Sequence, residues 1–122
     1  MTTNQTLNQF LTTVKSGEPV SFELSMQVID EHYLFTPTAF ENGKGVDTVI
    51  NPAGTNSGSC KIFAFARLHG LTQQQTLQLF GDYYHIDVLK NPDDSSHANI
   101  RNFMKYGWEG IQMPDNPIQL RD

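Results

Sequence analysis

The sequence has little cysteine, few basic residues and no long apolar run. Its 122 residues include one cysteine, Cys60, which excludes an internal disulfide and every zinc site built from several cysteines. Eight Lys and Arg stand against thirteen Asp and Glu, for a net charge of -5. We therefore expect no nucleic-acid partner, because such binding needs a basic face. No stretch approaches the roughly 18 consecutive apolar residues of a membrane span, so we expect no membrane insertion.

The length and composition fit an ordinary folded domain. Hydrophobic residues make up 38% of the chain and aromatic residues 11%. A chain of this size buries about two-thirds of its unfolded surface, so a true core is available. We expect residues 1–122 to form a single compact domain, since roughly 100–200 residues is the usual allowance for one.

Residues 1–16 combine a polar composition with helical apolar spacing. Leu7, Phe10, Leu11 and Val14 follow the i, i+3, i+4, i+7 pattern of one helix face, and Ser16-Gly17 is typical of a helix end. Ten of these sixteen residues are Thr, Asn, Gln or Ser. The segment is predicted as an amphipathic helix, and its composition also fits an export segment.

Four further segments are predicted as helices. Residues 20–33 carry apolar residues on two sides, which indicates a helix packed between neighbours. Residues 60–68 form a buried helix that ends at His69-Gly70. Thr72 and Gln75 match a capping box at the start of a helix that extends to Tyr84. Residues 100–104 mark a last helix, closed near Gly107.

Between these helices, residues 34–50 favour strands. The Asn42-Gly43 pair is a strong hairpin-turn signal, and Pro37 limits the first strand to a sheet edge. The predicted fold is therefore α+β and mainly helical, with about five helices, one small β-hairpin and a tail over residues 113–122.

Cys60 is the candidate for catalysis. It follows Gly58-Ser59 and opens a predicted helix, where unpaired backbone N–H groups and Lys61 would favour a thiolate. One of His32, His85 or His97 would then serve as the base of a small cysteine-dependent hydrolase or transferase. The alternative is a buried structural cysteine, which the apolar residues that follow favour.

Two polar segments are candidates for ligand binding. The loop with Asn56, Ser57 and Ser59 lacks the spacing of a nucleotide-binding P-loop, but its backbone N–H groups could bind an anion at a helix start. On the last helix His97, Arg101 and Lys105 lie four residues apart, with Trp108 as an aromatic wall beyond them. Helix capping by the serines and a solvated helix face are the structural alternatives.

No metal site or cofactor is predicted. Asp30, Glu31 and His32 are potential ligands, but consecutive helical residues point about 100° apart and do not converge on one ion.

Several motifs together resemble one known family. They are Phe80-Gly81-Asp82-Tyr83-Tyr84, the run from His97 to Met104 that closes in Gly107-Trp108, and the earlier Gly54-Thr55-Asn56 that leads into Gly58-Ser59-Cys60-Lys61. In this order, over about residues 20–112, the chain resembles the HopJ type III effector family. The resemblance implies a protein of the bacterial cytoplasm that a type III secretion system exports into host cells. It carries over no catalytic residue and no cofactor.

The expected function is accordingly a HopJ-like module that binds a protein partner or a small anionic ligand. A cysteine-dependent enzyme and an anion- or metabolite-binding domain are the alternatives.

Overall fold

The computed structural model describes residues 2–114 and 116–121, with side chains from residue 6 onward. The elements follow in the order α1 (Thr2–Lys15), α2 (Phe22–His32), β1 (Tyr33–Phe35), β2 (Phe40–Asn42), the 3-10 turn η1 (Gly45–Asp47), β3 (Val49–Asn51), α3 (Ser57–Leu68), α4 (Gln73–Gln78), the π-helical turn η2 (Tyr83–Val88), α5 (Ala98–Tyr106), the 3-10 turn η3 (Gly107–Gly110), β4 (Ile111–Gln112) and β5 (Ile118–Leu120). This confirms a mainly helical α+β fold.

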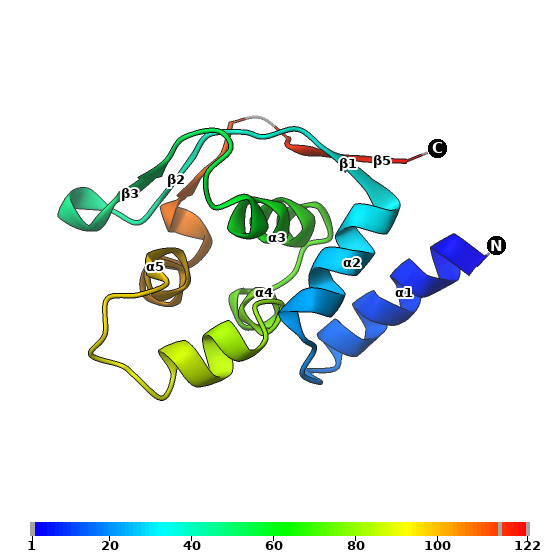
Figure 1. The fold of residues 1–122 in the computed structure, drawn as a ribbon, viewed down its shortest axis with the longest axis horizontal. Helices are drawn as coiled ribbons and strands as arrows, with labels where there is room; N and C mark the ends of the chain where they lie inside the picture. Colours follow the sequence, from blue (N-terminus) through cyan, green and yellow to red (C-terminus); the bar gives the residue numbers. More distant parts are fainter. Residues whose placement is uncertain (1, 115, 122) are drawn as a thin grey trace.

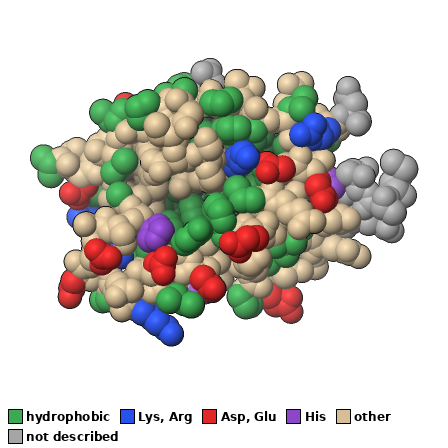
Figure 2. All heavy atoms as spheres, viewed as in Figure 1, with side chains coloured by type: hydrophobic (Ala, Val, Ile, Leu, Met, Phe, Trp, Pro, Cys, Tyr) green, Lys and Arg blue, Asp and Glu red, His purple; other side chains and the backbone are tan. Residues whose placement is uncertain are grey.

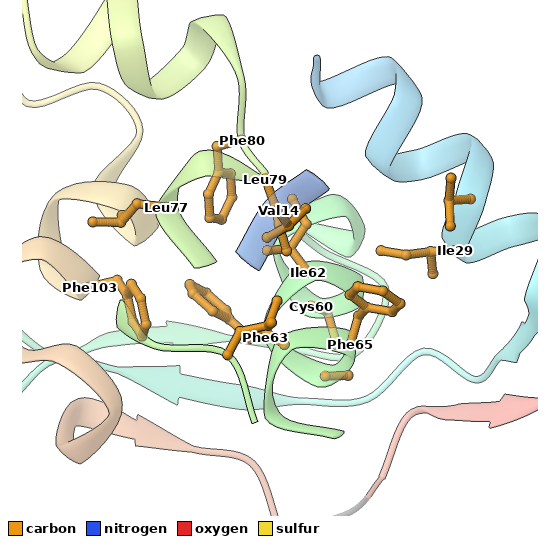
Figure 3. Packing of buried hydrophobic residues seen from close by; sticks show 14 of the residues in the cluster. Val14, Ile29, Cys60, Ile62, Phe63, Phe65, Leu77, Leu79, Phe80 and Phe103 are labelled. Atoms are coloured by element: carbon orange, nitrogen blue, oxygen red, sulfur yellow. The ribbon is translucent and has the colours of Figure 1, made fainter. Parts of the chain in front are cut away.

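Helix α3 lies at the centre of the molecule. In Figure 1, α2 and α1 lie on one side of it, α5 lies on the other, and the strands run along one edge. Phe63 and Phe65 of α3 are fully buried and point into different parts of the core (Figure 3). The Phe63 ring meets the rings of Phe40, Phe80 and Phe103 at centroid distances of 5.0–5.9 Å. The most apolar segment of the sequence therefore forms the centre of the core.

Local signals set the ends of several helices. Ser21 caps α2 by accepting from the backbone N–H of Leu24 at 3.0 Å. The predicted capping box of α4 is present, with Thr72 and Gln75 each bonding the other's backbone. α5 ends at Gly107, as predicted. Such contacts lie within four residues, so the sequence is sufficient to find them.

The hairpin is present but differs from the prediction in two respects. β2 and β3 pair antiparallel, but a loop with η1 joins them instead of a tight turn at Asn42-Gly43. β2 is also the middle strand of the order β3-β2-β4, so the edge position predicted from Pro37 is wrong. Pro37 lies before β2, and β4 pairs with the edge of β2 that β3 leaves open. A second small sheet joins β1 to β5, which lies in the predicted tail.

The helix predicted from Thr72 to Tyr84 is interrupted at Gly81. α4 ends at Gln78, and Gly81 adopts φ +59° before η2 begins. A Cβ at Gly81 would lie 2.6 Å from the backbone nitrogen of Phe22, so this chain reversal requires glycine. The reversal places Tyr83 against Phe22 at the start of α2.

His69 closes α3 in a half-buried position. Its Nε2 lies 2.6 Å from the Tyr33 hydroxyl, and its ring packs on Phe65 at 4.6 Å between centroids. Burial, aided by the charge of Lys15, lowers the pKa of His69. Burial also raises the pKa of Tyr33, so its hydroxyl stays protonated and shares a hydrogen bond with a neutral imidazole.

We expect His69 to make the fold less stable in acid. Below its ordinary pKa of about 6.5, the unfolded chain binds a proton that the folded chain does not, so the free energy of unfolding falls as the pH falls. The variant His69→Gln keeps an acceptor for Tyr33 but does not titrate. Urea unfolding from about pH 7 to pH 5 should therefore show a smaller loss of stability for the variant. Equal losses in both proteins would contradict this origin.

Candidate functional site

A cavity of about 390 Å³ lies where α2, α3 and α5 begin. Its apolar lining comes from Phe22, Val49, Phe80 and Ile100. Its polar lining comes from Asn56, Ser59, Tyr83, His97 and Asn99. The structure thus brings together three predicted ligand-binding residues, Asn56, Ser59 and His97, from two segments about forty positions apart.

Asn56 and His97 share an uncommon backbone conformation. Both are left-handed, with φ and ψ of 50° and 44° at Asn56 and of 54° and 50° at His97. Within the described residues they are the non-glycine residues with positive φ. This conformation costs a non-glycine residue about 1 kcal/mol or more, and such residues cluster at functional sites. Here both of them immediately precede a helix and line the same cavity.

Neither α3 nor α5 has a side-chain cap at its start, in contrast to α2 and α4. The backbone N–H of Cys60 bonds to Asn56 O, and that of Ile100 bonds to His97 O. The N–H groups before them have no acceptor within their helix. Gly58, Ser59, Ala98 and Asn99 belong to these first turns and line the cavity.

A network of buried asparagines holds the two helix starts together. Asn51 Oδ1 accepts from Asn56 Nδ2 at 2.7 Å and from Asn99 Nδ2 at 2.9 Å. Asn42 Nδ2 donates to Asn99 O at 2.8 Å, and Asn102 Nδ2 donates to Asn42 O at 3.0 Å. Asn42 and Asn51 are almost fully buried. This network links β2, β3, α3 and α5, and it fixes the left-handed Asn56.

His97 is held by a carboxylate and an aromatic ring. Its Nε2 lies 3.1 Å from Asp87 Oδ2, and its ring lies 5.2 Å from that of Tyr83. Tyr83 in turn meets Phe22 edge to face at 5.0 Å. On the face seen in Figure 2, a histidine lies beside exposed apolar side chains, with acidic side chains around them.

Glycine at position 58 makes room for this aromatic wall. A Cβ there would lie 2.8 Å from Phe22 Cζ, too close for any other residue without a shift of the ring. Gly58 therefore lets Phe22 approach the first turn of α3. This helix begins at Ser57, three residues before the predicted start at Cys60.

The other predicted ligand-binding residues lie away from the cavity. Ser57 is the first residue of α3 and is not part of the lining. Arg101 folds back to donate to the backbone carbonyls of Ser96 and Asp87. Trp108 packs on Phe103 and donates its indole N–H to Leu71 O at 3.1 Å. Arg101 and Trp108 thus do not join His97, although the sequence spacing suggested it.

Cys60 lies in the core. It is 1% exposed, and its thiol donates to Thr38 O at 3.6 Å. Burial raises the pKa of the Cys60 thiol, although a backbone hydrogen bond with Thr38 and the charge of Arg67 act in the opposite direction. The helix start was expected to favour a thiolate, whereas the observed surroundings favour the neutral thiol. This geometry supports the structural alternative.

The histidines proposed as its base have other surroundings. His85 Nε2 bonds Gln78 Oε1 at 2.8 Å, and His97 bonds Asp87. His32 is buried at the end of α2, while neighbouring Asp30 forms an exposed ion pair with Lys61 at 2.8 Å. Asp30 and His32 therefore point to different environments, as the helix geometry predicted.

Sequence reasoning missed Asp87 and the buried asparagines as parts of the site. Asp87 and Tyr83 lie in η2, whose position depends on the reversal at Gly81. Asn42 and Asn51 looked like turn and loop residues, and only their burial reveals their role.

Comparison with known proteins then assigns the chain to a family. The family model for the HopJ type III effector protein matches residues 7–118. The chain belongs to this family. A crystal structure described as that of the unknown-function protein VPA0580 is similar to this chain, with a TM-score of 0.88 and 46% sequence identity over 94% of this chain and 93% of the other. No curated protein gives a significant match.

The HopJ fold of this chain shows no membrane-spanning segment in the part that the structure describes. None of its helices there has both the length and the apolar character to cross a bilayer.

We expect the Cys60 thiol to react slowly while the protein is folded. Because the side chain is buried and its thiol stays protonated, alkylation by iodoacetamide at mildly alkaline pH should be at least about tenfold slower than in the denatured chain. Mass spectrometry of the alkylated peptide over time measures both rates. Equal rates would show an accessible, reactive thiol and would restore Cys60 as a candidate nucleophile.

Proposed function

We propose that this HopJ-family chain is a binding module whose ligand site is the cavity between the starts of α3 and α5. The proposed ligand is a small molecule that joins a carboxylate or phosphate group to an apolar portion. The observation that carries this proposal is the convergence of two uncapped helix starts, each preceded by a left-handed residue, on one cavity.

The polar wall suits an anionic group. Backbone N–H groups at a helix start carry partial positive charge and point outward along the helix axis. The first turns of α3 and α5 both supply such groups, and Ser59 adds a side-chain donor beside them. Because the asparagine network fixes both helix starts, these donors are already in position before a ligand binds.

The apolar wall suits a ring or a short hydrocarbon chain. Phe22, Phe80 and Ile100 line the same cavity as the polar donors, and the volume of about 390 Å³ fits a compact ligand. A bare inorganic anion would leave this wall in contact with water. The wall therefore favours a ligand such as an aromatic or short-chain carboxylate.

The net charge of the protein imposes a further condition. With a net charge of -5 and acidic side chains on the face seen in Figure 2, the long-range field does not attract anions. Affinity must come from short-range hydrogen bonds inside the cavity, which salt screens less than a surface charge. We expect binding of this kind to depend only weakly on ionic strength.

Benzoate binding tests the proposal. Calorimetry should detect benzoate and phenyl phosphate but not neutral benzyl alcohol. The variant Ser59→Asp places a negative charge in the cavity, yet an acidic residue in the first turn does not destabilise the helix. It should weaken benzoate binding about tenfold or more, which is about 1.4 kcal/mol.

The matched control is Gln74→Glu, which adds the same charge in the first turn of α4, outside the cavity lining. It should bind benzoate like the original protein. Absence of heat with every anion, or equal weakening by both variants, would count against the cavity as the site.

The family assignment also supports a proposal on where the protein acts. We infer that it is made in the bacterial cytoplasm and exported into host cells by a type III secretion system, with residues 1–16 as the export segment. The support is the HopJ type III effector match and the polar composition of that segment. Leu7, Phe10 and Val14 are buried against the domain, so deleting the segment would also disturb the core.

A reporter fusion separates export from folding. Residues 1–16 fused to a reporter enzyme should carry it into the medium of bacteria with an active type III apparatus and not of an export-deficient strain. The intact chain should behave in the same way. Retention of both proteins inside cells with a confirmed active apparatus would exclude type III export.

A further inference from the structure

Three side chains at the cavity form a group that simple binding does not require. Ser59 and His97 both line the cavity, and Asp87 hydrogen-bonds His97 from outside the lining. They come from α3, the residue before α5, and η2, which are separate in the sequence. A hydroxyl, an imidazole and a carboxylate at one cavity are the groups needed for acyl transfer.

We propose that the cavity hydrolyses small carboxylic esters, with Ser59 as nucleophile, His97 as general base and Asp87 as a positioning residue. This inference rests on the proposed function, because the carboxylate that the cavity is proposed to bind would be the acid product of the reaction.

Asp87 determines which nitrogen of His97 is available. Its Oδ2 lies 3.1 Å from Nε2, and a carboxylate accepts, so Nε2 carries the proton of a neutral imidazole. Nδ1 then holds the lone pair that can take a proton. The left-handed backbone of His97 and the Tyr83 ring restrict the orientation of the imidazole further. A base held by two neighbours needs little reorganisation before reaction.

Ser59 is suited to act as a nucleophile. Its side chain is half-buried on the cavity wall. Its hydroxyl makes no hydrogen bond within residues 2–114 and 116–121, to His97 or to any other residue, so the proposed proton transfer requires the hydroxyl to turn toward His97 when a substrate binds. It also does not cap α3, the role expected of a serine at this position. The neighbouring Cys60 points into the core because adjacent helical residues lie about 100° apart. The nucleophilic side chain that lines the cavity is therefore Ser59, and not Cys60 as the sequence suggested.

The reaction can be written with atoms and protons balanced. Ser59 Oγ attacks the ester carbonyl carbon while its proton passes to His97 Nδ1. Backbone N–H groups in the first turns of α3 and α5 are the available donors for the resulting oxyanion. The C–O bond to the leaving alcohol breaks as His97 returns the proton to it. Water then attacks the acyl-Ser59 ester through His97, which releases the acid and restores the serine.

The lining defines the substrate class. Phe22, Phe80 and Ile100 would contact the acyl portion, so aromatic and short-chain acyl esters fit better than long or charged ones. An amide is less favoured, since expelling an amine is harder than expelling an alcohol.

The test combines covalent labelling with turnover. The whole protein is treated with diisopropyl fluorophosphate, and peptide mass spectrometry locates the adduct. Hydrolysis of p-nitrophenyl butyrate is followed in parallel. We expect the adduct on Ser59, and we expect Ser59→Ala and His97→Asn to lower kcat about 100-fold or more. Asn suits the left-handed position of His97.

Asp87→Asn is the test of positioning. An amide would donate to Nε2 and move the imidazole proton to Nδ1, so kcat should fall about tenfold or more while KM stays the same. A purely structural role would instead lower thermal stability and leave kcat unchanged. Ser95→Ala and His85→Asn, which alter an exposed serine and a histidine outside the lining, should retain full activity.

Each outcome separates this inference from the proposed function. Absence of a Ser59 adduct, or ester hydrolysis that is unchanged in Ser59→Ala, overturns the reaction. If benzoate still binds in that case, the cavity remains a binding site. A lack of both benzoate binding and labelling, in protein shown to be folded by circular dichroism, overturns both.

Discussion

The site depends on the hydrogen bonds among buried asparagines. Asn51 accepts from Asn56 and Asn99 at once, so a single side-chain oxygen joins β3 to the starts of α3 and α5. Buried amides are costly unless they are paired, and a network whose buried polar atoms other than Asn42 Oδ1 are paired therefore permits few alternative arrangements. The relative position of two helices thus follows from polar contacts in a region where apolar packing alone would allow sliding.

Helix α3 serves the core and the cavity with different parts of its length. Its first turn carries Gly58 and Ser59 to the cavity, and its later turns carry Phe63 and Phe65 to the core. Cys60 lies between these two parts of the helix, and its side chain is buried in the core. Neighbouring residues of a helix point about 100° apart. Which side chain of this segment reaches the cavity therefore depends on the helix geometry and not on the residue type.

Much of the fold could be predicted because its signals are local. The apolar stripe of α1, the capping box at Thr72 and Gln75, and the end of α5 at Gly107 all concern residues within one or two turns of each other. The tight turn at Asn42-Gly43 was wrong because Asn42 belongs to β2 and pairs with Val49, with η1 in the loop between them. The edge position was wrong because β4, about seventy residues later, joins β2. The uninterrupted helix to Tyr84 failed at Gly81, where the chain turns through a left-handed glycine that packs against the backbone of Phe22.

The sequence by itself determined the mainly helical α+β class, the helix boundaries marked by caps and glycines, and the family. It also placed Asn56, Ser59 and His97 among the candidate residues, because backbone N–H groups at a helix start and a basic side chain on a helix face can bind an anion. Only the tertiary structure decided that these three share a cavity, that Asp87 joins His97, that Arg101 and Trp108 lie elsewhere, and that Cys60 is buried. The physical reason is that burial and contact between distant segments depend on how whole elements pack, and a one-dimensional pattern specifies only neighbours along the chain.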